Sequence, residues 1–463
     1  MKKWVFGVLA LLLVIGMAMP AMADVNISGS YRIRGVYYDY GGTSNRWSAP
    51  AATTRNTDAD DAMTFWDNRL RLELSAKISD NLSFFVQADT GLGYDGSEAA
   101  NPLANQDSYA GVFGNHWGNH EAGSAENRGG DHIVFQQAYF TYTEPILGGE
   151  VKVGRQWTFW GKGLIKSMNE NRIQYVYRQP KWFIGVGFEK WTEGDILNDK
   201  NDLNEYSVFG CVELPLPFVT VRYAPYFGAR VLSNKGGDEY FISNALKVKA
   251  LEKLEANVEF VYEWGHVENA GTGYGDDASI DAYAIAADVN YDLDIAKVGV
   301  EFAYLSGEYP NSNEKSGFHT SYWYSPFVIY GHLPIGPQLL APDGVHSWPN
   351  SAYHHELSNC YFFKLSATAE PIEKLEVTTA FGYIWAALDR LNSAGTAYIK
   401  GADDIGFEWD VTASYKITDN LHYHLEFGYL QTGDYYDAYD ATGGKVAKAA
   451  DAVALINAIQ INF

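Results

Sequence analysis

Three features of the sequence predict an all-β fold: a transmembrane antiparallel up-and-down β-barrel of about eighteen strands, preceded by a cleaved signal peptide. The first residues form an export signal, apolar and polar residues alternate through most of the chain, and short and long connections alternate between the predicted strands. We therefore expect a signal peptide over residues 1–23 and a single barrel domain over residues 24–463.

The export signal comes first. Lys2 and Lys3 precede an apolar run that ends in Ala21-Met22-Ala23, a cleavage site of the A-x-A type. No later stretch reaches the roughly 18 uninterrupted apolar residues that a membrane-spanning helix needs. The sequence therefore predicts an exported protein without a helical anchor, and the barrel pattern directs it to the outer membrane of a Gram-negative bacterium.

The stretch "NRLRLELSAKISDNLSFFVQAD", residues 68–89, shows the alternation most clearly. Leu70 and Leu72 leave one face of a strand and Arg69 and Arg71 leave the other, because successive side chains of a strand point to opposite faces. A polar turn divides the stretch into a hairpin. In a soluble sheet the leucines would cover a core; in a membrane barrel they face lipid and the charges face a wet interior.

The whole chain settles this choice in favour of the barrel. The predicted strands lie near residues 25–38, 65–78, 81–91, 132–143, 150–157, 171–178, 181–191, 205–214, 218–230, 239–250, 254–265, 280–291, 296–306, 355–369, 375–386, 404–416, 421–431 and 450–463. Every second connection is short, and the others are longer and richer in Gly, Asn and Asp. Brief periplasmic turns and extended outer loops are typical of outer-membrane barrels.

Composition excludes several other classes. The net charge of −23 at pH 7 argues against a nucleic-acid partner, which would need a basic face. Cys211 and Cys360 are the two cysteines, too few for a disulfide framework or for multiple haem sites. The 15% of aromatic residues suits the aromatic girdles of a membrane barrel. The last residues, "LINAIQINF", alternate and finish at Phe463, like the strand that the barrel-assembly machinery recognises, so this machinery is an expected partner.

A barrel of 16 to 18 strands leaves an aqueous channel. Carrying the lipid-facing parity along each strand gives the pore-lining and selectivity candidates. These are Arg32, Arg34, Arg69, Arg71, Lys152, Arg155, Arg172, Arg178, Arg222, Glu255, Glu259, Glu408, Asp410 and Glu426. Twelve of the thirteen arginines lie at or before Arg230, which predicts an arginine-bearing wall facing an acidic wall. The alternative is that the arginines pair with neighbouring carboxylates and only hold the wall together.

The stretch "VKVGRQWTFWGKG", residues 151–163, is the most distinctive. By strict alternation Arg155 would face lipid, so Gly154 is expected to form a bulge that turns Arg155 inward. The segment from Trp157 to Lys166 is a candidate for a loop that folds into the channel as a constriction. The alternative is an ordinary outer loop with an aromatic belt.

With its signal peptide, strand count, "NRLRLEL" and "VKVGRQ" strands and terminal Phe463, the sequence resembles outer-membrane porins of the alginate-export type. It is similar in size to substrate-specific porins for small acids. The resemblance implies an arginine-rich lumen that conducts anionic solutes and would place Arg32, Arg34, Arg69, Arg71 and Arg172 on the solute path. The acidic later strands depart from a purely anion-selective lumen.

Weaker patterns carry alternatives. His422, His424 and Glu426 share a strand face, as a metal site or as polar lumen residues, and His116, His120 and His132 are irregularly spaced in a loop. Acidic clusters at Asp58-Asp60-Asp61, Asp276-Asp277, Asp403-Asp404 and Asp434-Asp437-Asp440 are Ca²⁺ or lipopolysaccharide contacts, or simply solvated loops. The apolar segment 307–354 is expected to fold over or into the mouth. We expect no metal, no cofactor and no enzymatic activity.

Two functions follow from these patterns. The first is a porin, a water-filled channel for passive diffusion of small polar or charged solutes, with anionic sugars or organic acids as candidates. The second is a scaffold: a barrel that sheathes a partner protein, or a surface adhesin acting through its long loops. Outer-membrane lipid, lipopolysaccharide and small solutes are the expected partners of either a monomer or a trimer.

Overall fold

The computed structural model describes residues 24–39, 62–90, 133–192, 203–232, 236–271, 275–309, 313–321, 324–330, 357–392 and 398–463. The signal peptide, the histidines at 116, 120 and 132, the acidic residues at 58–61, the side chain of Asp276 and residues 331–356 lie outside this part. In the described part no helix is long and apolar enough to cross a membrane.

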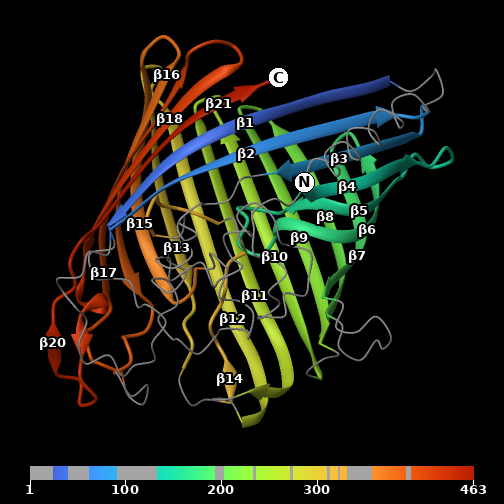
Figure 1. Ribbon diagram of the computed structural model, residues 1–463. Coiled ribbons are helices and arrows are strands. Elements are labelled where there is room, and N and C mark those ends of the chain that lie inside the picture. The colour runs from blue at the N-terminus through green and yellow to red at the C-terminus, as the bar shows by residue number, and fades with distance from the viewer. Residues whose placement is uncertain are drawn as a thin grey trace, which may run out of the picture.

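Strands that follow one another along the chain pair side by side, as the alternation and the short turns predict (Figure 1). In the described part, eighteen long strands form the barrel wall: β1 (Asp24–Asp39), β2 (Ala62–Lys77), β3 (Leu82–Thr90), β4 (Ile133–Thr143), β5 (Glu150–Phe159), β6 (Ser167–Gln179), β7 (Trp182–Thr192), β8 (Leu203–Leu216), β9 (Val219–Leu232), β10 (Gly237–Ala250), β11 (Leu254–Gly271), β12 (Gly275–Asp292), β13 (Lys297–Leu305), β15 (Cys360–Ile372), β16 (Leu375–Ala386), β17 (Asp404–Lys416), β18 (Leu421–Thr432) and β21 (Ala452–Asn462).

The sheet closes on itself, which leaves the barrel wall without an unpaired edge. β1 pairs antiparallel with β2 on one side and with β21 on the other. At the seam Gly29 N–H donates to Phe463 O at 2.8 Å, and Phe463 N–H donates to Gly29 O at 3.0 Å. Closure is what a barrel in lipid requires, because hydrocarbon cannot satisfy open backbone groups. The predicted all-β barrel of about eighteen strands is confirmed.

Among the described residues, three small strands lie outside this ring. β14 (Glu314–Lys315) pairs parallel with β12, and β19 (Ala438–Tyr439) pairs with β20 (Lys445–Ala447). A short 3-10 helix, Asp434–Tyr436, precedes β19. All three strands belong to long connections, on the side of the barrel opposite the short turns and the C-terminus (Figure 1).

The two faces of the wall differ as predicted. Val300, Leu365 and Phe381 are cross-strand neighbours on β13, β15 and β16, and they are 49%, 59% and 43% exposed on the outer face. On the inner face Lys364 pairs with Glu301, with Nζ and Oε2 separated by 2.6 Å. Alternation therefore sends apolar side chains towards lipid and charged ones into the lumen.

Candidate functional site: a narrowing inside the barrel

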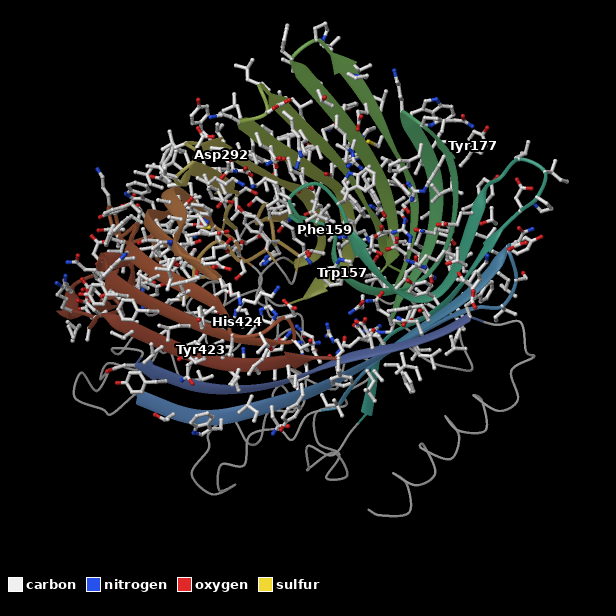
Figure 2. The ribbon with its side chains drawn as sticks, turned by 90° about the horizontal axis from the view of Figure 1, so that it is seen from above. Trp157, Phe159, Tyr177, Asp292, Tyr423 and His424 are labelled. Atoms are coloured by element: carbon white, nitrogen blue, oxygen red, sulfur yellow. The ribbon has the colours of Figure 1, made fainter. Side chains whose placement is uncertain are left out.

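The end of the β5–β6 hairpin leaves the barrel wall and enters the lumen. β4 pairs with β5 only as far as Arg155, and β7 pairs with β6 only from Asn171 onwards. Between these points residues 156–159 pair only with residues 167–170. We call residues 156–170 the inner hairpin. Figure 2 shows Trp157 and Phe159 towards the middle of the ring. The predicted inward loop is confirmed, and the alternative of an ordinary outer loop is wrong.

Gly154 lies where the hairpin begins to bend. Its φ is +126°, and a Cβ there would lie 2.2 Å from the carbonyl oxygen of Ala138. Only glycine tolerates this backbone and this close approach. Arg155 is 7% exposed and therefore is not presented to lipid, as predicted. The predicted bulge at Gly154 is wrong, however, because the β4–β5 pairing continues in register through this residue.

An aromatic cluster fixes the hairpin near its turn. The Trp160 ring makes edge contacts with Phe183, Phe209 and Tyr226, at centroid distances of 6.2, 5.7 and 5.4 Å. Its indole N–H donates to Ala224 O at 3.1 Å. These partners lie on β7, β8 and β9, so the hairpin packs on the inner face of that part of the wall.

The tip of the hairpin reaches further round, to β11. The Glu259 carboxylate accepts hydrogen bonds from the backbone N–H groups of Lys162 at 2.7 Å and Leu164 at 3.1 Å. The Lys162 ammonium pairs with Asp288 on β12 and lies 3.4 Å from Glu301 on β13. Glu259 was predicted as a pore-lining residue; it faces inward, but its side chain is covered by the hairpin tip.

A buried charge network holds the other arm of the hairpin. Lys166 is fully buried, with Nζ 2.7 Å from Glu170, 2.5 Å from Glu189 and 2.8 Å from Glu205. The three carboxylates compensate for the hydration that the buried ammonium has lost. The ion pairs with Glu189 and Glu205 tie the hairpin to β7 and β8.

Two arginines complete this network. Arg172 Nη1 lies 2.7 Å from Glu189 Oε1, and its guanidinium lies over the Phe209 ring at 4.8 Å. Arg230 Nε lies 3.1 Å from Glu205 Oε2. Arg172 was predicted to line the solute path, but it is 3% exposed and paired with a neighbouring carboxylate. It also borders the cavity described below, so its place on the solute path stays a prediction.

A second segment covers the opposite inner wall. We call residues 324–330 the inner strap. Its backbone N–H groups donate to inward carboxylates of β17: Val328 to Asp410 at 3.2 Å, and Ile329 and Tyr330 to Glu408 at 2.5 and 2.9 Å. The predicted acidic wall is corrected here, because Glu408 is fully buried under the strap. The apolar segment after β13 does fold inward, as far as the structure describes it.

Four of the predicted arginines lie on β1 and β2. Arg32 and Arg69 are cross-strand neighbours, and Arg34 lies opposite Asp67 in the β1–β2 register. Arg71 makes a two-point contact with Asp89 on β3, with both N–O distances 2.7 Å. We call Arg32, Arg34, Arg69 and Arg71 the arginine row. All four side chains are partly accessible, in contrast to Arg172.

A cavity of about 460 Å³ lies between the inner hairpin and the short-turn edge of the barrel. Six basic side chains line it: Lys152, Lys162, Arg172, Arg178, Arg222 and Lys247. Six aromatic side chains contribute as well: Trp157, Phe159, Trp160, Phe183, Phe209 and Tyr226. No acidic residue is among its described lining residues. Such a surface suits a ligand with a negative charge and an apolar or aromatic body.

The remaining predicted residues have local partners. Lys152 lies over the Tyr139 ring at 3.9 Å, and Arg178 over Phe183 at 4.7 Å. Arg222 Nε donates to Cys211 Sγ at 2.9 Å. Glu255 pairs with Lys247 at 2.6 Å and with Lys249 at 3.3 Å, near the short turns. Glu426 is half-buried on β18 between Thr412 and Ile456.

Two weaker predictions concern metals and cysteines. His422 and His424 stack with ring centroids 6.2 Å apart. The described residues contain no group of three or more His, Cys, Asp or Glu placed to hold a metal ion. Cys211 and Cys360 are both buried and are not joined to each other.

Sequence reasoning left out several residues of the narrowing. Lys162, Lys166, Glu205 and Arg230 were not among the candidates, although alternation along β8 and β9 puts Glu205 and Arg230 on the inner face. Parity could therefore have found these two. It could not find the lysines, because a residue in a hairpin turn has no parity to follow.

The closed barrel, its apolar outer face and its charged, internally narrowed lumen define a protein with the fold of outer-membrane porins. No protein-family model and no curated protein matches the sequence. Similar solved structures come from Pseudomonas aeruginosa. OccK9 (OpdG) has a TM-score of 0.54 at 12% identity, over 95% of this chain and 98% of that chain. OpdL has 0.52 at 11%, over 95% and 99%. OpdK, solved with vanillate, has 0.50 at 9%, over 95% and 99%. At these identities the likeness concerns the fold.

Proposed function

We propose that this protein is an outer-membrane porin, a water-filled channel for passive diffusion of small polar or charged solutes. The observation that carries the proposal is a closed barrel narrowed from within by a hairpin anchored across the lumen. Barrels of 16 to 18 strands are wide enough for water, and an inner segment restricts which solutes pass.

Small organic acids and anionic sugars are the proposed solutes. The basic and aromatic lining of the 460 Å³ cavity and the arginine row support this preference, because guanidinium groups bind carboxylates through two parallel hydrogen bonds. The similarly folded OpdK was crystallised with vanillate, an aromatic carboxylate. That the protein is a porin of the alginate-export type is a more specific proposal, and it rests on the sequence resemblance alone.

The sheath alternative has less support. The inner hairpin contacts β7 to β13 and the strap contacts β15 and β17, so protein segments of this chain occupy the inner surface that a sheathed partner would need. A channel for small solutes is compatible with a narrowed lumen.

Planar-bilayer recording of the purified protein tests the proposal. We expect steady conductance steps and an anion preference, measured as the reversal potential in a salt gradient. Arg69→Gln and Arg71→Gln should each shift the reversal potential towards cation preference, because each removes a positive charge from the lumen.

Lys77→Gln is the matched control. It removes the same charge from the same strand, but at the exposed rim, where Lys77 pairs with Asp80 at 2.9 Å and salt screens the field. An electrically silent wild-type barrel would contradict the channel. Equal shifts for Lys77→Gln and for the two arginine variants would remove the arginine row from selectivity.

A further inference from the structure

The tip of the inner hairpin is held by a carboxylate rather than by packing alone. Glu259 is fully buried and accepts hydrogen bonds from two backbone N–H groups of the tip and from the Ser243 hydroxyl at 2.7 Å. Gly161 makes this possible: its φ is +57°, and a Cβ there would lie 2.4 Å from the Glu259 carboxyl carbon. The tip is therefore shaped to fit this carboxylate.

A second fastening joins the hairpin to the segment that leads into the strap. Ser321 N–H donates to Leu164 O at 2.6 Å, and the Ser321 hydroxyl donates to Gly163 O at 3.1 Å. Lys364 strengthens the link, because its ammonium donates to Pro326 O at 2.7 Å and pairs with Glu301, which also lies near Lys162. The hairpin and the strap thus form one connected inner layer.

The hairpin tip is held on the side of the barrel opposite the arginine row. Counted round the eighteen strands, β11 with Glu259 lies opposite β1 and β2 with the arginine row. Glu259 therefore draws the hairpin tip towards the wall that faces the arginine row. A tip released from Glu259 and Ser321 would be free to move into the space in front of the arginines.

We propose that Glu259 and Ser321 are positioning residues that hold the inner hairpin back from the arginine row and so set the cross-section of the solute path. This inference rests on the proposed channel function. The two residues act through the backbone of the tip and not by touching the solute. Glu259, the inward carboxylate of β11, then fixes the position of the hairpin tip rather than forming one side of an acidic wall.

Single-channel recording of Glu259→Gln, Ser321→Ala and the double variant tests the proposal. We expect partial closures to become about tenfold more frequent in Glu259→Gln, because a hydrogen bond to a charged group is worth about one factor of ten. The double variant should close more often than either single one. Asp294→Asn is the matched control: it removes one carboxylate in the β12–β13 turn, at a φ of +69° that asparagine tolerates.

A labelling experiment keeps the proposal testable without conductance. A cysteine at Thr158, on the hairpin, should react faster with a membrane-impermeant maleimide in the Glu259→Gln background, again by about tenfold. Heat-modifiable migration on SDS gels verifies that each variant folds. If the wild-type barrel conducts no current but Glu259→Gln still raises the labelling rate, the proposed channel function is wrong and the positioning role is retained. The positioning role is wrong if the variants conduct with the closure frequency and labelling rate of the wild type. It is also wrong if they show a steady, larger conductance.

Discussion

At the scale of single residues, the inward-facing charges divide into two groups with different tasks. Glu259, Glu408 and Asp410 accept hydrogen bonds from backbone N–H groups of the inner hairpin and strap. Arg69 and Arg71 lie on β2, where Arg71 pairs with Asp89 on the neighbouring strand. A carboxylate that accepts backbone N–H groups satisfies donors that would otherwise be buried without partners, so its loss costs more than a surface charge would.

Arg172 provides a residue-scale prediction. It is 3% exposed and pairs with Glu189 at 2.7 Å, so replacing it with methionine leaves a buried carboxylate without one of its partners. We expect Arg172→Met to lower the free energy of unfolding by about 3–5 kcal/mol. Arg178→Met, whose side chain is exposed and stacks on Phe183, is the matched control and should cost about 1 kcal/mol or less.

Urea unfolding of the folded barrel, followed by tryptophan fluorescence, measures both variants. A loss for Arg172→Met no larger than for Arg178→Met would show that the buried pair adds nothing to stability. A change in reversal potential without a change in stability would instead return Arg172 to the solute path.

The sequence predicted which face of a strand a side chain lies on, but not the groups that the side chain binds. Alternation placed Arg71 and Glu259 on the inner face because that face is decided by the neighbouring residues of one strand. It could not reveal that Glu259 holds the backbone of Lys162, ninety-seven residues earlier. A contact across the lumen depends on how a loop folds, and local periodicity contains no information on that.

At the scale of elements, the wall was predictable because hairpins have short, polar turns and a strict period of two. One strand begins later than predicted: residues 357–359, the described part of its predicted start, precede β15, which begins at Cys360. Asn359 has a φ of +49°, which ends the extended pairing there, and its N–H bonds to Ser306 O instead. β11 and β12 extend beyond the predicted ends, since a polar continuation of a hairpin into solvent lacks the lipid-facing alternation.

The turn between β4 and β5 gives an element-scale prediction with a pH dependence. Glu144 accepts hydrogen bonds from the backbone N–H groups of Gly149, Ile146 and Leu147, at 3.1, 2.8 and 2.7 Å. The Gly149 bond, with the others, lowers the pKa of the Glu144 carboxyl below its usual value. A lowered pKa means that the ionised group stabilises the folded turn above the ordinary carboxyl pKa and that this contribution is lost as the pH falls through the lowered value.

We therefore expect Glu144→Gln to have a lower Tm than the wild type at neutral pH, with the difference shrinking as the pH falls through this range. Thermal unfolding of both proteins across a pH series measures it. Glu373→Gln, in the β15–β16 turn, is the control for the loss of one turn carboxylate. A difference that does not depend on pH would contradict the assigned role of the Glu144 charge.

At the scale of the whole molecule, the fold depends on an inside-out distribution of side chains. Apolar residues cover the outer face, whereas the inside combines charged side chains with the apolar residues that pack around the inner hairpin and strap. This same distribution explains why the sequence predicted the fold class, and inward folding of two segments, but not the residues that hold these segments in place. The lipid environment constrains every strand, whereas the contacts of the inner hairpin and strap depend on residues that are distant in the sequence.

Leu365 tests this distribution directly. It is 59% exposed on the outer face near the middle of β15, between Val300 and Phe381 on the neighbouring strands. Arginine at this depth should cost about 2–4 kcal/mol of unfolding free energy, because its charge would enter the hydrocarbon. Ile372→Arg makes the same change at the end of the same strand, where 60% of the side chain is exposed, and should cost about 0–1 kcal/mol at the interface. Unfolding in lipid vesicles measures both. Equal losses at the two positions would mean that the outer face of β15 does not lie in a bilayer, and the barrel would then have to be stabilised by some other surrounding.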